Sequence, residues 1–179
     1  MARSDQEAFN SLFRALYPRL VHFSFRYTRS KAVASDIVQD VFVMLWEKRR
    51  EIDPEQSPKA YLYRSVRNRS LNYLRDHSGE TIGLEPMSES RLSLPADEDG
   101  TGEEPEELVR LLNGWISDLP KRQREAFELS RFDGLDHEEI AGVMEVSSHT
   151  VNNHIVAALY TLRDRYHAYQ KELNKEQRL

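Results

Sequence analysis

Apolar residues recur every three or four positions along most of this 179-residue chain, which is the spacing of an α-helix with one buried face. The pattern predicts seven helices, at residues 5–28, 31–49, 58–76, 106–117, 120–131, 136–144 and from about 147 onward. No alternation of apolar and polar residues is long enough to predict a strand. We therefore expect an all-α fold.

Residues typical of helix ends support several of these boundaries. Pro58 would stand in the first turn of its helix, where its missing N–H does no harm. Asp136, with Glu139 three residues later, resembles a capping box, and Ser147 is a good cap for the last helix. Pro18, in contrast, lies inside the first helix and predicts a kink or break near Tyr17, because proline removes a backbone hydrogen bond.

Residues 79–105 separate the first three predicted helices from the last four. They are rich in Gly, Pro, Ser, Asp and Glu and lack apolar periodicity, which predicts a flexible, self-repelling linker. A more specific alternative is an acidic tether that mimics DNA or threads a basic channel in a partner. We therefore expect two small helical domains, at residues 1–78 and 106–173.

The net charge of −5 is unevenly distributed along the chain. Residues 1–78 carry 14 basic and 9 acidic side chains, residues 79–107 carry 1 and 10, and residues 108–179 carry 10 and 11. Because the acid is concentrated around the linker, the two domains keep a local field that is compatible with nucleic acid.

Composition excludes several classes of protein. With 39% hydrophobic and 31% charged residues the chain can bury a core. The absence of cysteine excludes disulfides, thiolate zinc sites and cysteine nucleophiles. The N-terminus lacks a signal peptide, and no apolar run approaches the ~20 residues that cross a bilayer. We expect a cytoplasmic protein with no membrane insertion.

The segment 134–163 has the spacing of a helix-turn-helix. Polar residues occupy the start of its second helix, where this motif meets base edges and phosphates: Ser148, His149, Thr150, Asn152, Asn153 and His154. Asparagine can pair with adenine through two hydrogen bonds. The alternative is an ordinary helical hairpin with a polar face. No metal is expected at the two histidines, because no third ligand is suitably spaced.

The predicted helix 58–76 carries a polar, cationic stripe at three- and four-residue spacing, formed by Arg64, Arg67, Asn68, Asn72 and Arg75. Tyr61 and Tyr73 are interleaved with it. A basic stripe with neighbouring aromatic rings suits DNA whose bases are being unstacked. A plain solvated basic face would give the same pattern, so the stripe alone does not decide between the two.

In the predicted helix 31–49 one face carries Asp36, Gln39, Asp40 and Val43, which alone indicates no more than an amphipathic core helix. Its motif D-I-V-Q-D-V-F-x-x-L-W is followed along the chain by A-Y-L-Y-R-x-x-R-N-x-x-L-N-Y-L-R, L-P-x-x-x-R-E-A-F and S-x-x-T-V-x-x-H-I-x-x-A-L-x-x-L-R. In this order and spacing the motifs resemble the extracytoplasmic-function (ECF) sigma factors of bacterial RNA polymerase. The resemblance covers nearly the whole chain except the linker and the last few residues.

The resemblance implies a sigma region 2 bundle of three to four helices, and a four-helix sigma region 4 with a helix-turn-helix. The face with Asp36, Gln39, Asp40 and Val43 would grip the β′ clamp helices of the polymerase. The −10 element would be recognised and melted by the loop at 51–57 and the stripe, through Gln56, Ser57, Arg64, Arg67, Asn68, Asn72 and Arg75. The −35 element would be recognised by the six residues at the start of the last helix.

The resemblance also implies partners. These are core RNA polymerase, through its β′ clamp helices and β flap, promoter DNA, and an anti-sigma factor, with the free protein a monomer. It implies no enzymatic activity and no cofactor. In the family the linker tends to run through the RNA exit channel, which makes charge mimicry by the acidic linker a hypothesis.

The chain departs from the family pattern in its second domain. Glu145 stands where the turn usually carries glycine, so we expect the backbone there not to take a left-handed conformation easily. Asn152 and His154 replace residues that are often Lys or Arg, which predicts weaker attraction to phosphate.

Two other classes of function compete with a sigma factor. A regulator of the response-regulator type also ends in S-x-x-T-V-x-x-H-I, but residues 1–78 lack the βα alternation of a receiver domain. An enzyme is not indicated, because the chain has no phosphate-binding glycine loop, no nucleophile elbow and no paired carboxylates in a catalytic context.

Overall fold

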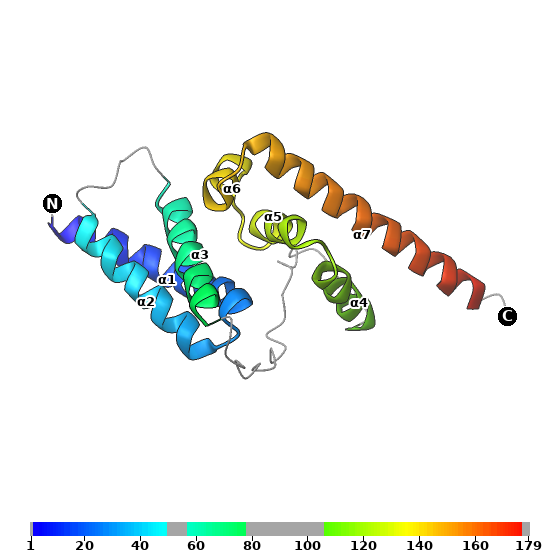
Figure 1. Ribbon diagram of the computed structural model, residues 1–179, viewed down its shortest axis with the longest axis horizontal. Coiled ribbons are helices and arrows are strands. Elements are labelled where there is room, and N and C mark those ends of the chain that lie inside the picture. Colours follow the sequence, from blue (N-terminus) through cyan, green and yellow to red (C-terminus); the bar gives the residue numbers. More distant parts are fainter. Residues whose placement is uncertain (1, 50–56, 78–105, 177–179) are drawn as a thin grey trace. The chain divides into compact units, whose positions relative to one another are not determined.

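The computed structural model describes residues 2–49, 57–77 and 106–176. In these ranges the chain forms seven helices and no strand, and it divides into two compact units, Met1–Ser88 and Glu89–Leu179 (Figure 1). The predicted all-α fold with two helical domains is confirmed. The expected linker at 79–105 lies outside the described residues. None of the described helices combines the length and the apolar content that crossing a bilayer requires.

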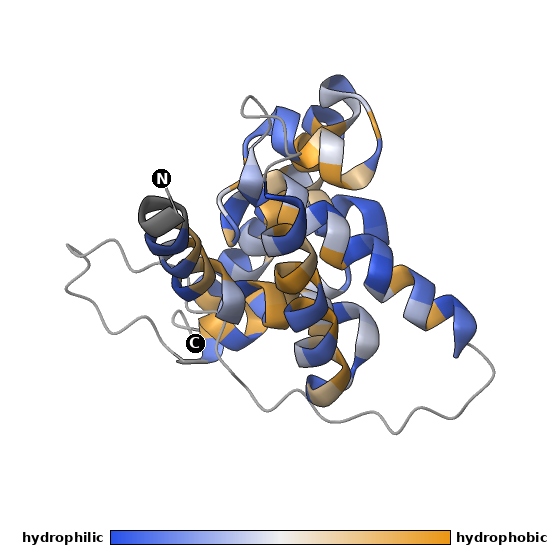
Figure 2. Ribbon diagram, turned by 90° about the vertical axis from the view of Figure 1, so that its left-hand side faces the viewer, coloured by the Kyte–Doolittle hydropathy of each residue, from blue (hydrophilic) through white to orange (hydrophobic). Residues whose placement is uncertain are grey.

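The first unit is a bundle of α1 (Ala2–Thr28), α2 (Lys31–Lys48) and α3 (Pro58–Asp76), in which each helix packs against the other two. Hydrophobic and hydrophilic residues are interspersed along the helices, as in amphipathic helices (Figure 2). The Phe23 ring of α1 meets the Tyr63 ring of α3 edge-on, with their centroids 5.1 Å apart. Both side chains are fully buried, so this pair stands at the centre of the unit.

A second group of aromatic rings joins α1 to α2. The Phe9 ring lies 5.9 Å from Phe42 and 4.9 Å from Trp46, and Phe13 lies 4.8 Å from Phe42, all in edge-on arrangements. Such pairs contribute about 0.5–1.5 kcal/mol each beyond their burial. They fix the rotation of α2 about its axis, and with it the face that α2 presents to solvent.

Helix α1 runs unbroken through Pro18, so of the predicted kink or break near Tyr17 the break is wrong. Pro18 is exposed, whereas Leu16 and Leu20 on either side of it are buried. A proline in a helix interior costs about 3 kcal/mol. The apolar face that α1 buries on both sides of Pro18 offsets that cost and keeps the helix continuous.

The second unit contains α4 (Glu106–Ser117), α5 (Lys121–Arg131), α6 (His137–Met144) and α7 (Ser148–Glu176). Helices α4, α5 and α6 all pack against α7. A buried cluster lies where α4, α5 and α7 meet, formed by Ile116, Leu119, Phe127, Ala158 and Leu162. Further along α7 the Arg165 guanidinium forms an ion pair with Asp118, at 2.8 Å.

Several predicted helix ends are found with their caps. Helix α3 begins at Pro58, and the Ser57 hydroxyl accepts a hydrogen bond from the Ala60 N–H, at 3.3 Å. Helix α6 begins after Asp136, whose carboxylate accepts from the Glu139 N–H while the Glu139 carboxylate accepts from the Asp136 N–H. The predicted capping box is therefore present. Helix α5 begins one residue later than predicted, with Pro120 in the capping position.

Candidate functional site

Helix α2 presents all four predicted residues, Asp36, Gln39, Asp40 and Val43, on its exposed side. On the other side of α2, Val38, Val41 and Leu45 are buried against the rest of the bundle. Val43 is 56% exposed, so an aliphatic side chain lies among the polar groups on this side of the helix. Helix α2 thus buries one face in its own unit and offers a second face of carboxylate, amide and aliphatic groups. We call the four residues the α2 face.

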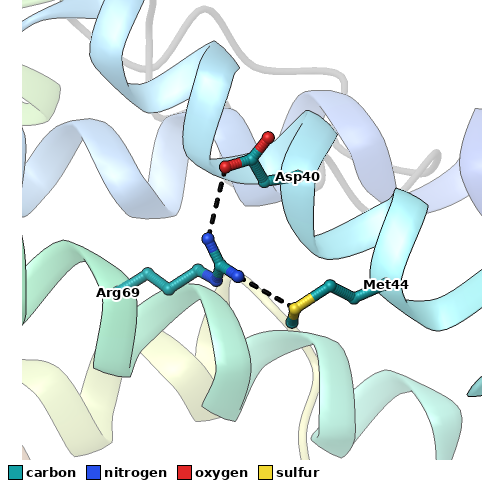
Figure 3. A network of polar contacts seen from close by, with 3 residues as sticks. All are labelled: Asp40, Met44 and Arg69. Atoms are coloured by element: carbon teal, nitrogen blue, oxygen red, sulfur yellow. Dashed lines mark hydrogen bonds and ion pairs between the residues drawn. The ribbon is translucent and has the colours of Figure 1, made fainter.

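Two contacts tie the α2 face to neighbouring helices. The Arg69 guanidinium of α3 donates to the Asp40 carboxylate at 3.2 Å and lies 2.9 Å from the Met44 sulfur (Figure 3). The Gln39 amide donates to the Tyr17 hydroxyl of α1, at 3.4 Å. Sequence reasoning missed Arg69, because no local spacing links it to Asp40, 29 residues earlier.

The residues of the predicted cationic stripe on α3 differ in their exposure to solvent. Arg64, Asn72 and Arg75 are exposed, and Asn68 is half-buried. Arg67 is only 6% exposed, so it is not part of the same accessible surface. Near it the Ser24 and Ser70 hydroxyls share a buried hydrogen bond at 2.8 Å, which makes this flank of α3 a polar contact with α1. Ser57 is half-buried at the helix N-terminus, and Gln56 lies outside the described residues.

Aromatic rings flank the exposed part of α3. Tyr61 and Tyr73 are both half-buried. The Tyr73 ring stacks on the His77 ring, with centroids 4.1 Å apart and planes 24° apart. A partly exposed, flat pair of this kind is a surface on which a base could stack.

Helices α6 and α7 form the predicted helix-turn-helix (Figure 1). The turn departs from expectation, because Glu145 takes the left-handed conformation with φ 57° and ψ 48°. The Val146 N–H then donates to the Ala141 carbonyl at 3.1 Å, the hydrogen bond of a helix-terminating Schellman motif. This bond, together with burial of Met144 and Val151 on either side, outweighs the strain of a left-handed side-chain residue.

The first turns of α7 hold the six residues predicted to face DNA. Ser148, His149, Asn152 and Asn153 are exposed, and Thr150 and His154 are half-buried. Ser147 caps the helix, since its hydroxyl accepts from the Thr150 N–H at 3.1 Å and also lies 2.9 Å from the Thr150 hydroxyl. Val151 and Ile155 are buried on the opposite side. Burial of Val151 and Ile155 therefore determines which side of α7 is exposed, and the polar residues lie on that side.

Two exposed apolar side chains continue this face and were missed by sequence reasoning. Val156 is 55% exposed and Tyr160 is 73% exposed. Val156 follows Asn153 and Asn152 by three and four residues, and Tyr160 follows Val156 by four, a helical spacing that could have identified them. No group of three or more potential metal ligands occurs among the described side chains.

Two family models match the chain, one in each unit. Sigma-70 region 2 matches residues 12–80, and sigma-70 region 4 matches residues 115–162. The first match contains the α2 face and α3, and the second contains the helix-turn-helix. Each candidate surface therefore lies inside a matched region.

Curated relatives match over most of their length. An ECF RNA polymerase sigma factor RpoE of Cereibacter sphaeroides is 30% identical over 163 residues, which cover 89% of this chain and 86% of the relative. The ECF RNA polymerase sigma-E factor of Escherichia coli K12 is 30% identical over 165 residues, which cover 87% and 85%.

Two solved structures have the same fold. CnrH, in complex with the cytosolic domain of CnrY, matches with a TM-score of 0.59 at 20% identity, over 91% of this chain and 90% of CnrH. The sigma factor RpoE of Bartonella quintana, in complex with the anti-sigma factor NepR, matches with a TM-score of 0.61 at 19% identity, over 88% and 96%.

Proposed function

The chain is a sigma factor of the extracytoplasmic-function family, and on that premise we propose which of its surfaces bind the polymerase and which bind the promoter. As a sigma factor it serves transcription initiation. Matches to region 2 and region 4, in this order, disfavour the alternative of a response-regulator-type protein that acts without polymerase. The same surfaces would give the protein its role as a non-enzymatic initiation factor in the cytoplasm.

The α2 face is proposed to bind the β′ clamp helices of core RNA polymerase. The supporting observation is the 56% exposure of Val43 beside Asp36, Gln39 and Asp40, on a helix whose other side is buried in its own bundle. Protein-binding surfaces combine apolar and polar groups, and the α2 face offers both on a side of the helix that its own bundle leaves uncovered. The β flap would bind the second unit.

Helix α3 is proposed to act on the −10 element through its exposed residues Arg64, Asn72 and Arg75, with Asn68 at the margin. Positive charge next to the Tyr73–His77 pair supports a role on DNA that is being opened, since such DNA offers both phosphates and unstacked bases. Ser57 would contribute through the start of the helix. Arg67 is better explained as a buried residue that supports α3 from behind, because it is 6% exposed.

The start of α7 is proposed to bind the −35 element in the major groove. Support comes from the exposure of Ser148, His149, Asn152 and Asn153 on a helix that is capped and rotationally fixed. Thr150 and His154 are half-buried and would contact DNA only at the edge of the surface. Base-specific pairing would come chiefly from the two asparagines.

An anti-sigma factor is proposed as the third partner. The solved CnrH and RpoE structures are complexes with the cytosolic domain of CnrY and with the anti-sigma factor NepR. A protein that covered the α2 face or the start of α7 would block polymerase or promoter binding. Without it, the free protein would be a monomer.

Run-off transcription with purified core polymerase tests this assignment. Core polymerase plus the protein should give transcripts with a small set of defined starts, identified by sequencing their 5′ ends. Asp40→Ala and Gln39→Ala should each weaken core binding at least about fivefold, as expected of central interface residues. Glu7→Ala, which removes an exposed acid from α1, is the matched control. Unchanged core binding in both α2 variants would refute the assignment of the α2 face.

A further inference from the structure

We propose that Arg69 is a positioning residue of the polymerase-binding surface, which holds the Asp40 carboxylate in the orientation that polymerase binds. This inference rests on the proposed function of the α2 face. Arg69 lies on α3, outside that face and outside the exposed stripe assigned to the −10 element. Its effect on polymerase binding would be exerted through Asp40.

The geometry restrains the guanidinium at two points. One terminal nitrogen of Arg69 lies 3.2 Å from an Asp40 carboxylate oxygen, and the other lies 2.9 Å from the Met44 sulfur. Asp40 and Met44 stand one turn apart on α2, so the planar guanidinium bridges that turn from the neighbouring helix (Figure 3). Contacts at both terminal nitrogens fix the plane of the group, which a single contact would leave free to rotate.

Exposure shows that the restrained carboxylate is still available to a partner. The Asp40 side chain is 68% exposed, and that of Arg69 is 38% exposed. A carboxylate has about four lone-pair positions, so Asp40 can accept from Arg69 and from a second donor together. The pair therefore presents an oriented acceptor next to the amide of Gln39 and the exposed Val43, and such a site fits a cationic or N–H-rich side chain on polymerase.

Folding of the bundle does not depend on this pair. Buried residues already hold the helices together, including Val38 and Val41 on α2 and Leu62 and Val66 on α3. An ion pair with partners this exposed adds little to stability. Its main effect is to restrict the rotamers of the Asp40 side chain before polymerase binds. Without Arg69, Asp40 would lose this rotamer freedom only on binding, and that loss would weaken the complex.

The positive charge of Arg69 has the opposite effect on polymerase binding. The direction in which the dissociation constant changes when Arg69 is removed therefore tests the proposal. A neighbouring cation weakens the attraction of Asp40 for a basic partner. If orientation dominates, removal of Arg69 weakens polymerase binding. If charge competition dominates, removal of Arg69 strengthens it.

A double-mutant cycle on the full-length protein decides between these outcomes. The dissociation constant for core polymerase would be measured at one salt concentration for the wild type, Arg69→Ala, Asp40→Ala and the double variant. We expect Arg69→Ala to weaken binding about threefold, as for one exposed charge-assisted contact, and to have no further effect once Asp40 is alanine. Arg69→Lys should recover part of the loss, because lysine keeps the positive charge but lacks the two terminal nitrogens that contact Asp40 and Met44 together.

Controls separate positioning from a general structural role. Arg14→Ala removes an exposed arginine from α1 and should leave the dissociation constant unchanged. Met44→Leu keeps apolar volume without the sulfur contact and should have a smaller effect than Arg69→Ala. Thermal unfolding of each variant would be recorded, since a structural role alone lowers the melting temperature without the dependence on Asp40.

The outcomes distinguish this inference from the function on which it rests. If Asp40→Ala leaves core binding unchanged, the assignment of Asp40 to polymerase fails. If Asp40→Ala weakens binding but Arg69→Ala does not, or strengthens it, Arg69 is not a positioning residue. Equal losses from Arg69→Ala with and without Asp40 would mean that Arg69 acts independently of Asp40, by direct contact with polymerase if the melting temperature is unchanged or through the fold if it falls, and either result would also overturn the proposal.

Discussion

Helix α3 of the first unit and helix α7 of the second both carry polar residues at helical spacing, yet their exposed faces are set in different ways. The start of α7 is set by neighbours in sequence, through the Ser147 cap, the left-handed turn at Glu145 and the buried Val151 and Ile155. The face of α3 is set by buried contacts with α1, 40 and 46 residues earlier in the chain, through the Phe23–Tyr63 ring pair and the Ser24–Ser70 hydrogen bond.

This difference separates two kinds of binding surface. A surface fixed by local signals depends on its own unit and tolerates changes in distant residues. A surface fixed by long-range contacts changes whenever the packing of its bundle changes. The α2 face and the stripe on α3 belong to the second kind, so the surfaces proposed to bind polymerase and to act on the −10 element share one set of helix contacts.

The largest expected effect comes from removing the ring at the centre of the first unit. Phe23→Ala should lower the free energy of unfolding of that unit by about 3–5 kcal/mol, because a fully buried aromatic ring leaves a cavity. Hydrogen exchange followed by mass spectrometry would show the loss of protection helix by helix. We expect the loss in α1, α2 and α3, with α5, α6 and α7 unchanged.

The matched variant in the second unit is Leu129→Ala, which also removes a fully buried side chain. It should lower protection in α5, α6 and α7 and leave the first unit intact. Equal loss of protection in both units, from either variant, would contradict the idea that each unit is stabilised by its own core.

A smaller effect is expected from the proposed base contacts on α7. Asn152→Ala and Asn153→Ala should each reduce discrimination against promoters with an altered −35 element by about 1–3 kcal/mol, since each change removes exposed donors and acceptors that are proposed to face the groove. Discrimination would be measured as the ratio of open-complex yields on matched and altered promoters, with the protein bound to core polymerase. Asn113→Ala on α4 is the control, and a loss as large in Asn113→Ala as in the two α7 variants would contradict the assignment.

The same contrast explains how much could be predicted from the sequence. Helix positions, the helix start at Pro58, the Asp136 and Ser147 caps and the helix-turn-helix follow from local patterns, and all are found. The burial of Arg67 and the contact between Arg69 and Asp40 depend on how α3 lies against α1 and α2, and no spacing within one helix carries that information. Pro18 is a related case, because packing on both sides of it overrides a correct local argument.

The smallest expected effect is at Glu145, where the sequence predicted that the backbone would not easily take the left-handed conformation that it does take. The helix-turn-helix needs a left-handed residue there, with φ 57°, and a residue with a β-carbon takes this conformation at a cost of about 1–2 kcal/mol. Glycine avoids that strain but has more conformational freedom in the unfolded chain, which offsets part of the gain. Glu145→Gly should therefore stabilise the second unit by about 0.5–1 kcal/mol relative to Glu145→Ala, measured by denaturant unfolding. The alanine variant is the proper reference, because it removes the same side-chain interactions and keeps the strain. Equal stability of the two variants would mean that the turn relaxes away from the left-handed conformation, and that the face of α7 is not fixed by its local turn.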